Sequence, residues 1–385
     1  MKTYLSIYPH CYSYKHNNFL FLYEPQSHNY EIIHNALLPK NFDRNRIFQI
    51  DETEDTFDEI VDRCVKKNLG YIYNTESTVP PINKPYNIKF ISSLSKLKSA
   101  LGYNNGLSIL NYVTTIKIET TNKSTKLNQK HLYEQIGYPE FNLSKKSCMP
   151  LLDTNYTFPN LQEIIISGDF DEKIIAQIAV KYPTCLITIR TFFQKNDLNR
   201  IRTILSTYSN VNLNFIINSI DGYFIIQKVP DLKDFPIIFT LLVSSLDGLT
   251  DICHENFNLE ILPIIYDTEI QKDLISEMLL SAEDILSTNQ TLDDIYKKEI
   301  INTNFFGTLA IKSNGDVMVI NEHIGNIYHN DFLSEMTEWM NSDKNLWFQT
   351  RIKWDKCSEC PFIALCPSIT IYEEQGLLLK SCKNI

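Results

Sequence analysis

Short apolar runs alternate with amphipathic segments between residues 110 and 303, and this alternation constrains the fold more than any other feature of the chain. Runs of strand length are followed by stretches whose apolar residues recur every three or four positions, as they do along a helix. The helical stretches lie at 171–181, 198–205 and 269–280, and the strand candidates at 113–119, 161–167, 186–190, 211–218, 236–244 and 259–265. Apolar strands with helical crossovers predict an α/β fold with a parallel sheet, open or barrel-like, that is covered on both faces.

The segments on either side have different patterns. Residues 1–78 contain strand candidates at 5–8, 19–23 and 46–50, and then an amphipathic helix at 55–67 that carries Cys64 on its apolar face. Residues 79–109 include a Pro- and Asn-containing stretch that is typical of a linker. Residues 304–385 begin with apolar runs on either side of Asn314-Gly315, which predicts a β-hairpin.

Composition excludes several classes of protein. The net charge of -10 and the absence of a Lys/Arg stripe argue against a nucleic-acid partner. No apolar run approaches the roughly 18 residues that a membrane span needs. Nine cysteines, an odd number, favour reduced thiols and a cytoplasmic protein. With 11 glycines and no G-x-G-x-x-G or Walker A sequence, the chain lacks a phosphate-binding loop.

Four cysteines near the C-terminus form the strongest chemical motif. Cys357, Cys360, Cys366 and Cys382, here called the cysteine quartet, follow the spacing Cys-x2-Cys-x5-Cys-x15-Cys. Four thiolates complete the ligand set of one [4Fe–4S] cluster or of one structural zinc ion, and spacing alone does not decide between them. We therefore expect a metal centre at the cysteine quartet, an iron–sulfur cluster or, as the alternative, zinc.

The tail resembles the SPASM domain, which holds auxiliary iron–sulfur clusters at the C-terminus of many radical SAM peptide maturases. The hairpin has the family's Gly-x4-Cys spacing after Gly315, although Ile320 stands at the cysteine position, and Gly325-Asn326 matches the family's Gly-Asn step. The cysteine quartet matches the ligands of the second auxiliary cluster. A further cysteine would follow Cys366 after a three-residue spacer, where this chain has Thr370. The resemblance implies that the first auxiliary cluster is lost and that one [4Fe–4S] cluster is kept.

The middle region resembles a radical SAM partial barrel that has lost its catalytic ligands. Thr125, Gln129 and Leu132 occupy the Cys-x3-Cys-x2-Cys positions that hold the cluster for cleaving S-adenosylmethionine, and Tyr133 matches the aromatic residue that follows. Ser167-Gly168-Asp169 lies where the family has a Gly-Gly-Glu segment. Because iron needs thiolates there, the resemblance implies no S-adenosylmethionine cofactor and no functional radical SAM enzyme.

The resemblance therefore implies a degenerate partial (β/α)6 barrel at 110–303, a SPASM domain at 304–385, and at 1–78 a winged-helix-like module of the kind that recognises leader peptides. Proteins of this type resemble accessory components of ribosomal peptide natural-product systems in Bacteroidota. The implied function is an accessory scaffold that binds a precursor peptide and partners a true radical SAM maturase. An extended peptide would add to an exposed strand edge of the N-terminal module.

Two alternatives remain open from the residues. The chain is a SPASM-type peptide maturase acting through its single cluster beside an ATP-grasp ligase, or it is a zinc-stabilised peptide-binding protein. No acid/base or nucleophile constellation stands out, so we assign no catalytic residue. The remaining cysteines and histidines lack paired spacing, and we expect them in the core or on the surface: Cys11, Cys148, Cys185, Cys253, His131, His254, His323 and His329.

Overall fold

The computed structural model describes most of the 385 residues. The described ranges are 2–16, 19–34, 47–50, 55–75, 107–119, 149–167, 172–192, 198–217, 237–247, 258–265, 268–320, 322–342, 345–378 and residue 382. No helix within these ranges is both long and apolar enough to cross a membrane.

A nine-stranded, mostly parallel sheet forms the body of the protein, with strand order β12-β11-β10-β9-β8-β7-β13-β14-β15. Strands β7 to β12 are parallel to one another, β13 is parallel to β7, and β14 and β15 are antiparallel. The strands are β7 (Thr115–Glu119), β8 (Glu163–Ser167), β9 (Leu186–Phe192), β10 (Val211–Ile217), β11 (Ile237–Val243), β12 (Asn258–Pro263), β13 (Thr308–Ile311), β14 (Asp316–Val319) and β15 (Glu322–Asn326).

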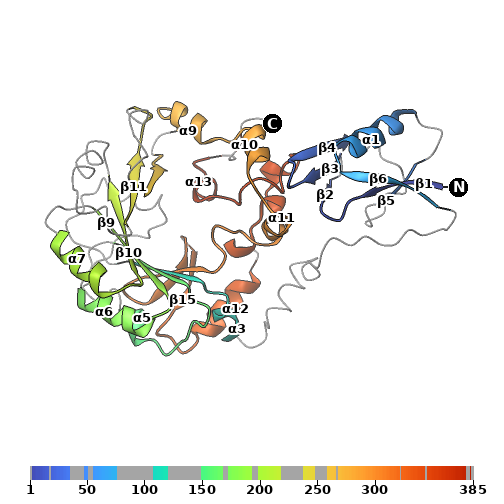
Figure 1. Ribbon diagram of the computed structural model, residues 1–385. Helices are drawn as coiled ribbons and strands as arrows, with labels where there is room; N and C mark the ends of the chain where they lie inside the picture. Colours follow the sequence, from blue (N-terminus) through green and yellow to red (C-terminus); the bar gives the residue numbers. More distant parts are fainter. Residues whose placement is uncertain are drawn as a thin grey trace.

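The order of the parallel strands explains the shape of this sheet. β7 to β12 follow one another without a reversal, and because crossovers between parallel strands are right-handed, consecutive order places the crossover helices on the same face. Figure 1 shows the sheet curving, with α5 (Met149–Asp153), α6 (Glu172–Lys181) and α7 (Leu198–Thr207) on its outer side. The largest core cluster lies between them and is dominated by buried Ile, Leu, Val and Phe.

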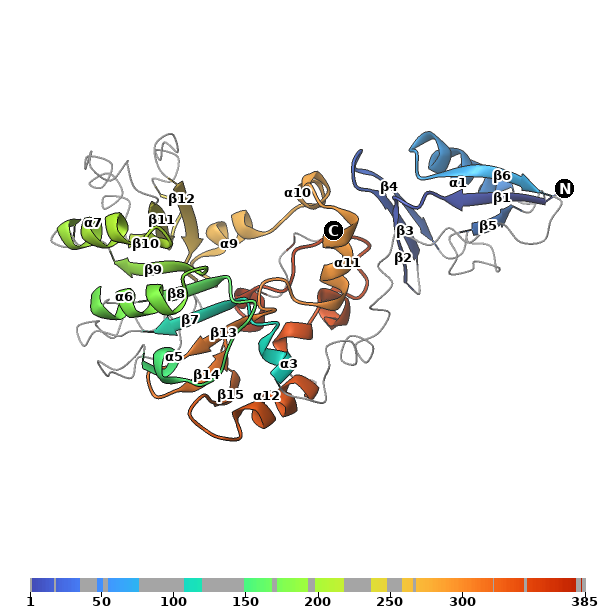
Figure 2. The ribbon, with the colours of Figure 1, turned by 60° about the horizontal axis from the view of Figure 1, so that its bottom comes forward.

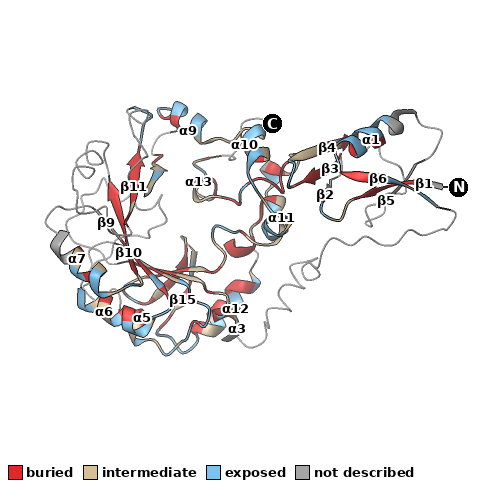
Figure 3. Ribbon diagram, in the orientation of Figure 1, coloured by how far each residue is buried: buried red, intermediate tan, exposed pale blue. Residues whose placement is uncertain are grey.

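The opposite face of the sheet carries polar side chains. On β9, β10 and β11, Thr188, Asn214 and Thr240 are buried on that face, while the alternate residues of the same strands point into the main core. We call this the inner face of the sheet. Figure 3 shows how deeply the central strands β10 and β11 are buried.

The C-terminal hairpin continues the sheet. β13 pairs with β7, and β14 and β15 extend the sheet from there. Gly325 permits a close approach, because a Cβ atom there would lie 2.1 Å from Oε2 of Glu335, which accepts a hydrogen bond from the Asn326 backbone N–H. The Gly-Asn step therefore joins the hairpin to α12 (Phe332–Asn341).

The N-terminal region contains two antiparallel three-stranded sheets, with orders β5-β1-β6 and β2-β3-β4. The strands are β1 (Lys2–Ile7), β2 (Tyr12–Lys15), β3 (Phe19–Glu24), β4 (Asn29–His34), β5 (Ile47–Ile50) and β6 (Gly70–Thr75). Helix α1 (Asp55–Lys66) packs with Ile60, Val61 and Cys64 against these sheets. Glu31 on β4 accepts hydrogen bonds from Arg63 and Lys67, which ties the helix end to the second sheet.

One face of the β2-β3-β4 sheet packs against the C-terminal region. Phe21 meets Phe362 with ring centroids 5.6 Å apart, and Tyr12 packs on Tyr296 at 5.5 Å. The Tyr12 hydroxyl donates to Glu299, whose pKa is raised by burial. Figure 2 shows this sheet next to α11 (Leu292–Ile300), between the outer N-terminal sheet and the body of the protein.

Shorter helices complete the chain. These shorter elements are α3 (Leu107–Leu110), α9 (Lys272–Met278), α10 (Ala282–Ser287), η8 (Leu346–Phe348), η9 (Arg351–Lys353), η10 (Asp355–Cys357) and α13 (Ile371–Glu374). Capping boxes begin three of the helices, at Ser281 in α10, Thr291 in α11 and Thr370 in α13, so their first N–H groups are satisfied locally.

The sequence prediction of a parallel α/β sheet is confirmed, with the six predicted strands corresponding to β7–β12. The expectation that crossover helices cover both faces is wrong, because the consecutive strand order places α5, α6 and α7 on the outer face. The predicted hairpin is confirmed as β13–β14, and Cys64 is fully buried as predicted. The prediction missed β2, β4 and β6 in the N-terminal region. Most of the predicted linker, 79–109, lies outside the described residues.

The Phe21–Phe362 contact predicts that docking of the N-terminal sheet stabilises the whole chain. Replacing the buried Phe362 by Ala should lower the free energy of unfolding by about 3 kcal/mol, because a large core side chain is lost. The measurement is urea denaturation, with Tyr328→Ala as the control, since Tyr328 is 48% exposed. A Phe362→Ala variant as stable as the control would contradict this docking.

Candidate functional site

The cysteine quartet comes together from two parts of the tail. Cys357 ends η10, Cys360 and Cys366 follow in a turn-rich segment, and Cys382 forms a parallel bridge with Leu280. Cys357, Cys366 and Cys382 are buried, and Cys360 is partly buried. The segment is held locally, because the Cys360 and Cys366 N–H groups donate to the carbonyls of Cys357 and Phe362.

The electrostatics show that the four thiols are neighbours. Burial raises the pKa of the Cys366 thiol to about 12, the Arg351 guanidinium opposes this, and Cys382, Cys357 and Cys360 each raise it further. Arg351 also donates a hydrogen bond to the Cys357 sulfur at 3.6 Å. Cys366, Cys382 and the partly buried Cys360 lie in one apolar cluster, and Cys357 lies beside the Arg351 guanidinium.

The thiols are not arranged at ligand distances. Within the described ranges, no group of three or more His, Cys, Asp or Glu side chains converges as metal ligands do. The two observations are compatible, because charges interact over longer distances than a metal–sulfur bond. The donor set fits a metal that prefers sulfur, such as iron in a cluster or zinc.

A buried ion pair fixes the segment that carries these cysteines. Arg351 and Glu373 form two hydrogen bonds of 2.7 and 2.9 Å, with side chains that are 4% and 0% exposed. Arg351 also donates to the carbonyls of Pro367 and Ser368. Burial alone would lower the pKa of Arg351, but the hydrogen bonds and charge of Glu373, together with Cys366, raise it overall. The guanidinium thus organises the backbone around the quartet.

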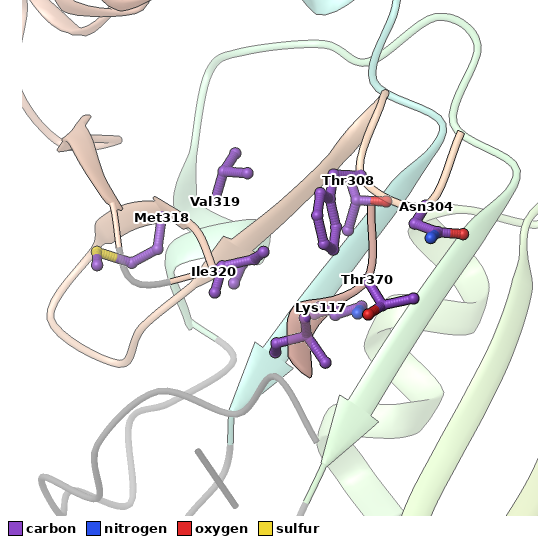
Figure 4. A pocket seen from close by; sticks show the side chains of 10 residues that line it. Lys117, Asn304, Thr308, Met318, Val319, Ile320 and Thr370 are labelled. Carbon is purple, nitrogen blue, oxygen red and sulfur yellow. The ribbon is translucent and has the colours of Figure 1, made fainter. Parts of the chain in front are cut away.

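A pocket with a volume of about 240 Å³ lies on the inner face of the sheet. Its floor is a row across three strands, in which Met318, Ala310 and Lys117 stand in register. Figure 4 shows Ile320 on one side of it and Lys117, Thr308 and Thr370 on the other. The lining residues are Lys117, Asn304, Phe305, Thr308, Ala310, Met318, Val319, Ile320, Thr370 and Ile371.

Ile320 has an unusual backbone conformation for its residue type. It begins the two-residue connection between β14 and β15, with φ of 53°. A β-branched residue in this left-handed region is strained, and Gly or Asn is preferred there. The strain is tolerated where the Ile320 side chain packs on the main core and lines the pocket.

Polar pairs continue across the inner face from this pocket. Thr188 donates to Glu163 at 2.8 Å, and the Thr240 hydroxyl lies 2.8 Å from Asn214 Oδ1 and 3.2 Å from Glu260. Arg190 lies 3.9 Å from the Glu260 carboxylate. The inner face also carries a small apolar cluster that includes Ile216 and Leu242, so it is mixed in character, whereas the outer face is apolar.

The four predicted metal ligands are close enough for their charges to interact, but in the described residues they do not converge as ligands do. Ile320 and Thr370 line one pocket. Thr125, Gln129, Leu132, Gly168 and Asp169 lie outside the described residues. So do four of the cysteines and histidines that we expected in the core or on the surface: Cys148, Cys253, His131 and His254.

The described members of that group match the expectation. Cys11 is buried, and Cys185 is buried and donates to the Leu161 carbonyl. His323 and His329 are exposed at the surface, near Asp316 and Glu335.

The sequence prediction missed Lys117, Arg351 and Glu373. Thr370-x-x-Glu373 is a capping-box signature that could have been found, and the structure shows both of its hydrogen bonds. Lys117 alternates with buried isoleucines in β7, a pattern that places it on the inner face but does not reveal a pocket.

Comparisons with protein-family models, with curated proteins and with solved structures found no match.

The buried ion pair predicts a large stability effect. Arg351→Met should lower the free energy of unfolding by about 3–5 kcal/mol, because it leaves the Glu373 carboxylate buried without its partner. Adding Glu373→Gln should recover part of this loss, since the buried charge is then removed as well. Denaturation of the wild type, both single variants and the double variant in one metal state measures the coupling. Additive effects would contradict a direct interaction.

Proposed function

We propose that this protein is an accessory scaffold in the maturation of a ribosomally synthesised peptide. It binds a precursor peptide, partners a true radical SAM maturase and does not cleave S-adenosylmethionine itself. The observation that carries this proposal is the position of Ile320 and Thr370. A resemblance in sequence assigns both positions to one auxiliary cluster, and the two residues, 50 positions apart, line the same pocket. Their common position in one pocket supports the resemblance to the SPASM domain. Because Ile and Thr have no thiolate, their side chains also support the proposed loss of that cluster.

The topology supports the finer interpretation of the fold. Six parallel strands in consecutive order with helices on one face are what a partial (β/α)6 barrel requires. The hairpin, α12 and the cysteine segment would form the SPASM domain. The β5-β1-β6 sheet with α1 would be the winged-helix-like module.

The cysteine quartet would hold a single [4Fe–4S] cluster. Three of its thiols are buried and Cys360 is partly buried, and the positive charge of the nearby Arg351 would stabilise thiolates bound to iron. When bound, such a cluster supplies electron transfer or a structural cross-link. Zinc is the alternative metal, because it accepts the same four sulfur ligands. All seven described cysteines are free thiols, which favours a reducing compartment such as the cytoplasm.

The edge of the N-terminal sheet offers a place for the peptide. Among the described strands of its sheet, β6 lies at the edge and pairs with β1 on one side. Ile72, in the middle of β6, is 48% exposed, and Tyr71 and Tyr73 beside it are partly exposed. An extended leader peptide would add as a fourth strand and cover Ile72.

A second candidate, a SPASM-type maturase that acts through its cluster beside an ATP-grasp ligase, differs in requiring turnover. Its test is peptide modification by the purified chain and ligase, with Cys360→Ala as the control. Modification lost in that variant would favour this candidate over the scaffold. Unmodified peptide in both cases would favour the scaffold.

Metal loading tests the cysteine quartet. Protein purified without oxygen should contain about four iron and four sulfide per chain and show visible charge-transfer absorbance. Cys360→Ala should lose most of this content, whereas Cys185→Ala, the matched core cysteine, should keep it. About one zinc without sulfide would identify the alternative metal. Unchanged metal content in Cys360→Ala would rule out the four-ligand assignment.

Partner binding tests the scaffold. Co-expression with a Cys-x3-Cys-x2-Cys maturase and its precursor peptide from the same gene neighbourhood should give a ternary complex. Ile72→Glu should weaken binding of the labelled precursor about tenfold or more, because it places a charge on the peptide-binding edge. Val180→Glu is the matched control, since Val180 is exposed on α6. No complex and no effect on modification would refute the proposed function.

A further inference from the structure

Lys298 on α11 lies beside the cysteine quartet, although it is far from it in sequence. Its ammonium donates a 2.8 Å hydrogen bond to the carbonyl of Leu365, the residue before Cys366, and it also donates to Oε1 of Gln290. The Gln290 amide nitrogen donates to the same Leu365 carbonyl at 2.9 Å. The two side chains and the carbonyl therefore form a closed set of hydrogen bonds that holds the backbone next to Cys366.

The surroundings of Lys298 are those of a cation drawn away from water. Its side chain is partly buried, and Leu365 and Cys366 belong to the apolar cluster beneath the β2-β3-β4 sheet. Burial lowers the pKa of Lys298 to about 8, although the charges of Cys366 and Asp294 raise it, and Arg351 lowers it further. Cys366 is thus the charge that acts most strongly on Lys298 in the described part of the chain.

The other cation near the quartet is already neutralised. Arg351 forms two hydrogen bonds with the buried Glu373 carboxylate, so this pair as a whole carries no net charge. On α11, the ion pair that the structure describes joins Asp293 to Lys297 and does not include Lys298. Lys298 is therefore the positive charge beside the cysteines that a buried carboxylate does not offset among the described residues.

The charge of the quartet changes when a metal binds. Four neutral thiols carry no charge, whereas four thiolates around one Zn²⁺ or around a [4Fe–4S]²⁺ core carry about two negative charges together. A nearby cation favours the thiolate form of a cysteine and stabilises the negative complex, and this effect is larger in a partly desolvated site than in water. The position of Lys298 thus favours the loaded state over the metal-free state.

We propose that Lys298 is a positioning residue of the metal centre, which holds the backbone before Cys366 and supplies the positive charge that offsets the metal-bound thiolates. Gln290 assists by orienting the Lys298 ammonium on the Leu365 carbonyl. This inference rests on the proposed metal centre at the cysteine quartet. It assigns to α11, a helix outside the cysteine segment, a direct part in metal binding.

Titration of the reduced full chain with Co²⁺, in competition with a chelator, tests this role. Cysteine thiolates bind Co²⁺ in place of zinc and give sulfur-to-metal absorbance whatever metal the protein holds in the cell. Lys298→Met should weaken Co²⁺ binding about tenfold or more, because the charge that stabilises the thiolates is lost. Lys297→Met is the matched control, since it removes a neighbouring lysine that is exposed, and it should bind Co²⁺ as the wild type does.

Two further variants separate the charge from the hydrogen bond and keep the test decisive if Lys298→Met does not fold. Lys298→Gln keeps an N–H donor for the Leu365 carbonyl but has no charge, so its affinity for Co²⁺ should fall as in Lys298→Met. Lys298→Arg keeps the charge and should recover most of the affinity. Wild-type affinity in Lys298→Gln would overturn the proposed charge role.

The reduction potential gives a second measurement if the purified chain holds an iron–sulfur cluster. Lys298→Met should lower the potential, because reduction adds negative charge that the missing ammonium no longer stabilises. An unchanged potential would contradict the inference.

The outcome in the wild type distinguishes this inference from the proposal on which it rests. A wild type without sulfur-to-cobalt absorbance would overturn both the metal centre and the role of Lys298. A wild type that binds Co²⁺ no more tightly than Lys298→Met does would overturn the role of Lys298 alone.

Discussion

The buried ion pair between Arg351 and Glu373 is the interaction on which the C-terminal half depends. Moving both charges out of water is costly, and the pair persists because two short hydrogen bonds and the carbonyls of Pro367 and Ser368 satisfy the guanidinium. The same guanidinium contacts the Cys357 sulfur. One side chain thus joins the cysteine segment to the helix that follows it.

That helix, α13, contacts strands in two distant parts of the curved sheet. Its N-cap residue, Thr370, lines the pocket over β7, β13 and β14. Two residues later, Tyr372 donates a 2.6 Å hydrogen bond to the carbonyl of Pro263 at the end of β12. A short helix placed by one ion pair therefore spans the inner face between strands that are far apart in the sheet. Metal at the quartet would act on this segment.

Local patterns predicted much of the fold, and long-range contacts account for what they missed. The strands β7–β12 and the core position of Cys64 follow from apolar periodicity, which depends on neighbours in sequence. In β4, the charged Glu31 is buried, because it accepts hydrogen bonds from Arg63 in α1 and from Lys67 just after it. A buried charge breaks the alternation of apolar and polar residues by which a strand is predicted. The four cysteines were found by spacing. Arg351 and Glu373 are 22 residues apart, and nothing local indicates their pairing.

The consecutive strand order separates the apolar packing that stabilises the sheet from the side chains of its inner face. Right-handed crossovers place the helices and the main core on the outer face, so stability there comes from apolar packing that no metal ligand contributes to. The inner face is then free to vary. Polar side chains on this face form hydrogen bonds with one another, as Thr188 does with Glu163. The outer face thus supplies the packing that stabilises the sheet, and the pocket and the polar pairs lie on the inner face.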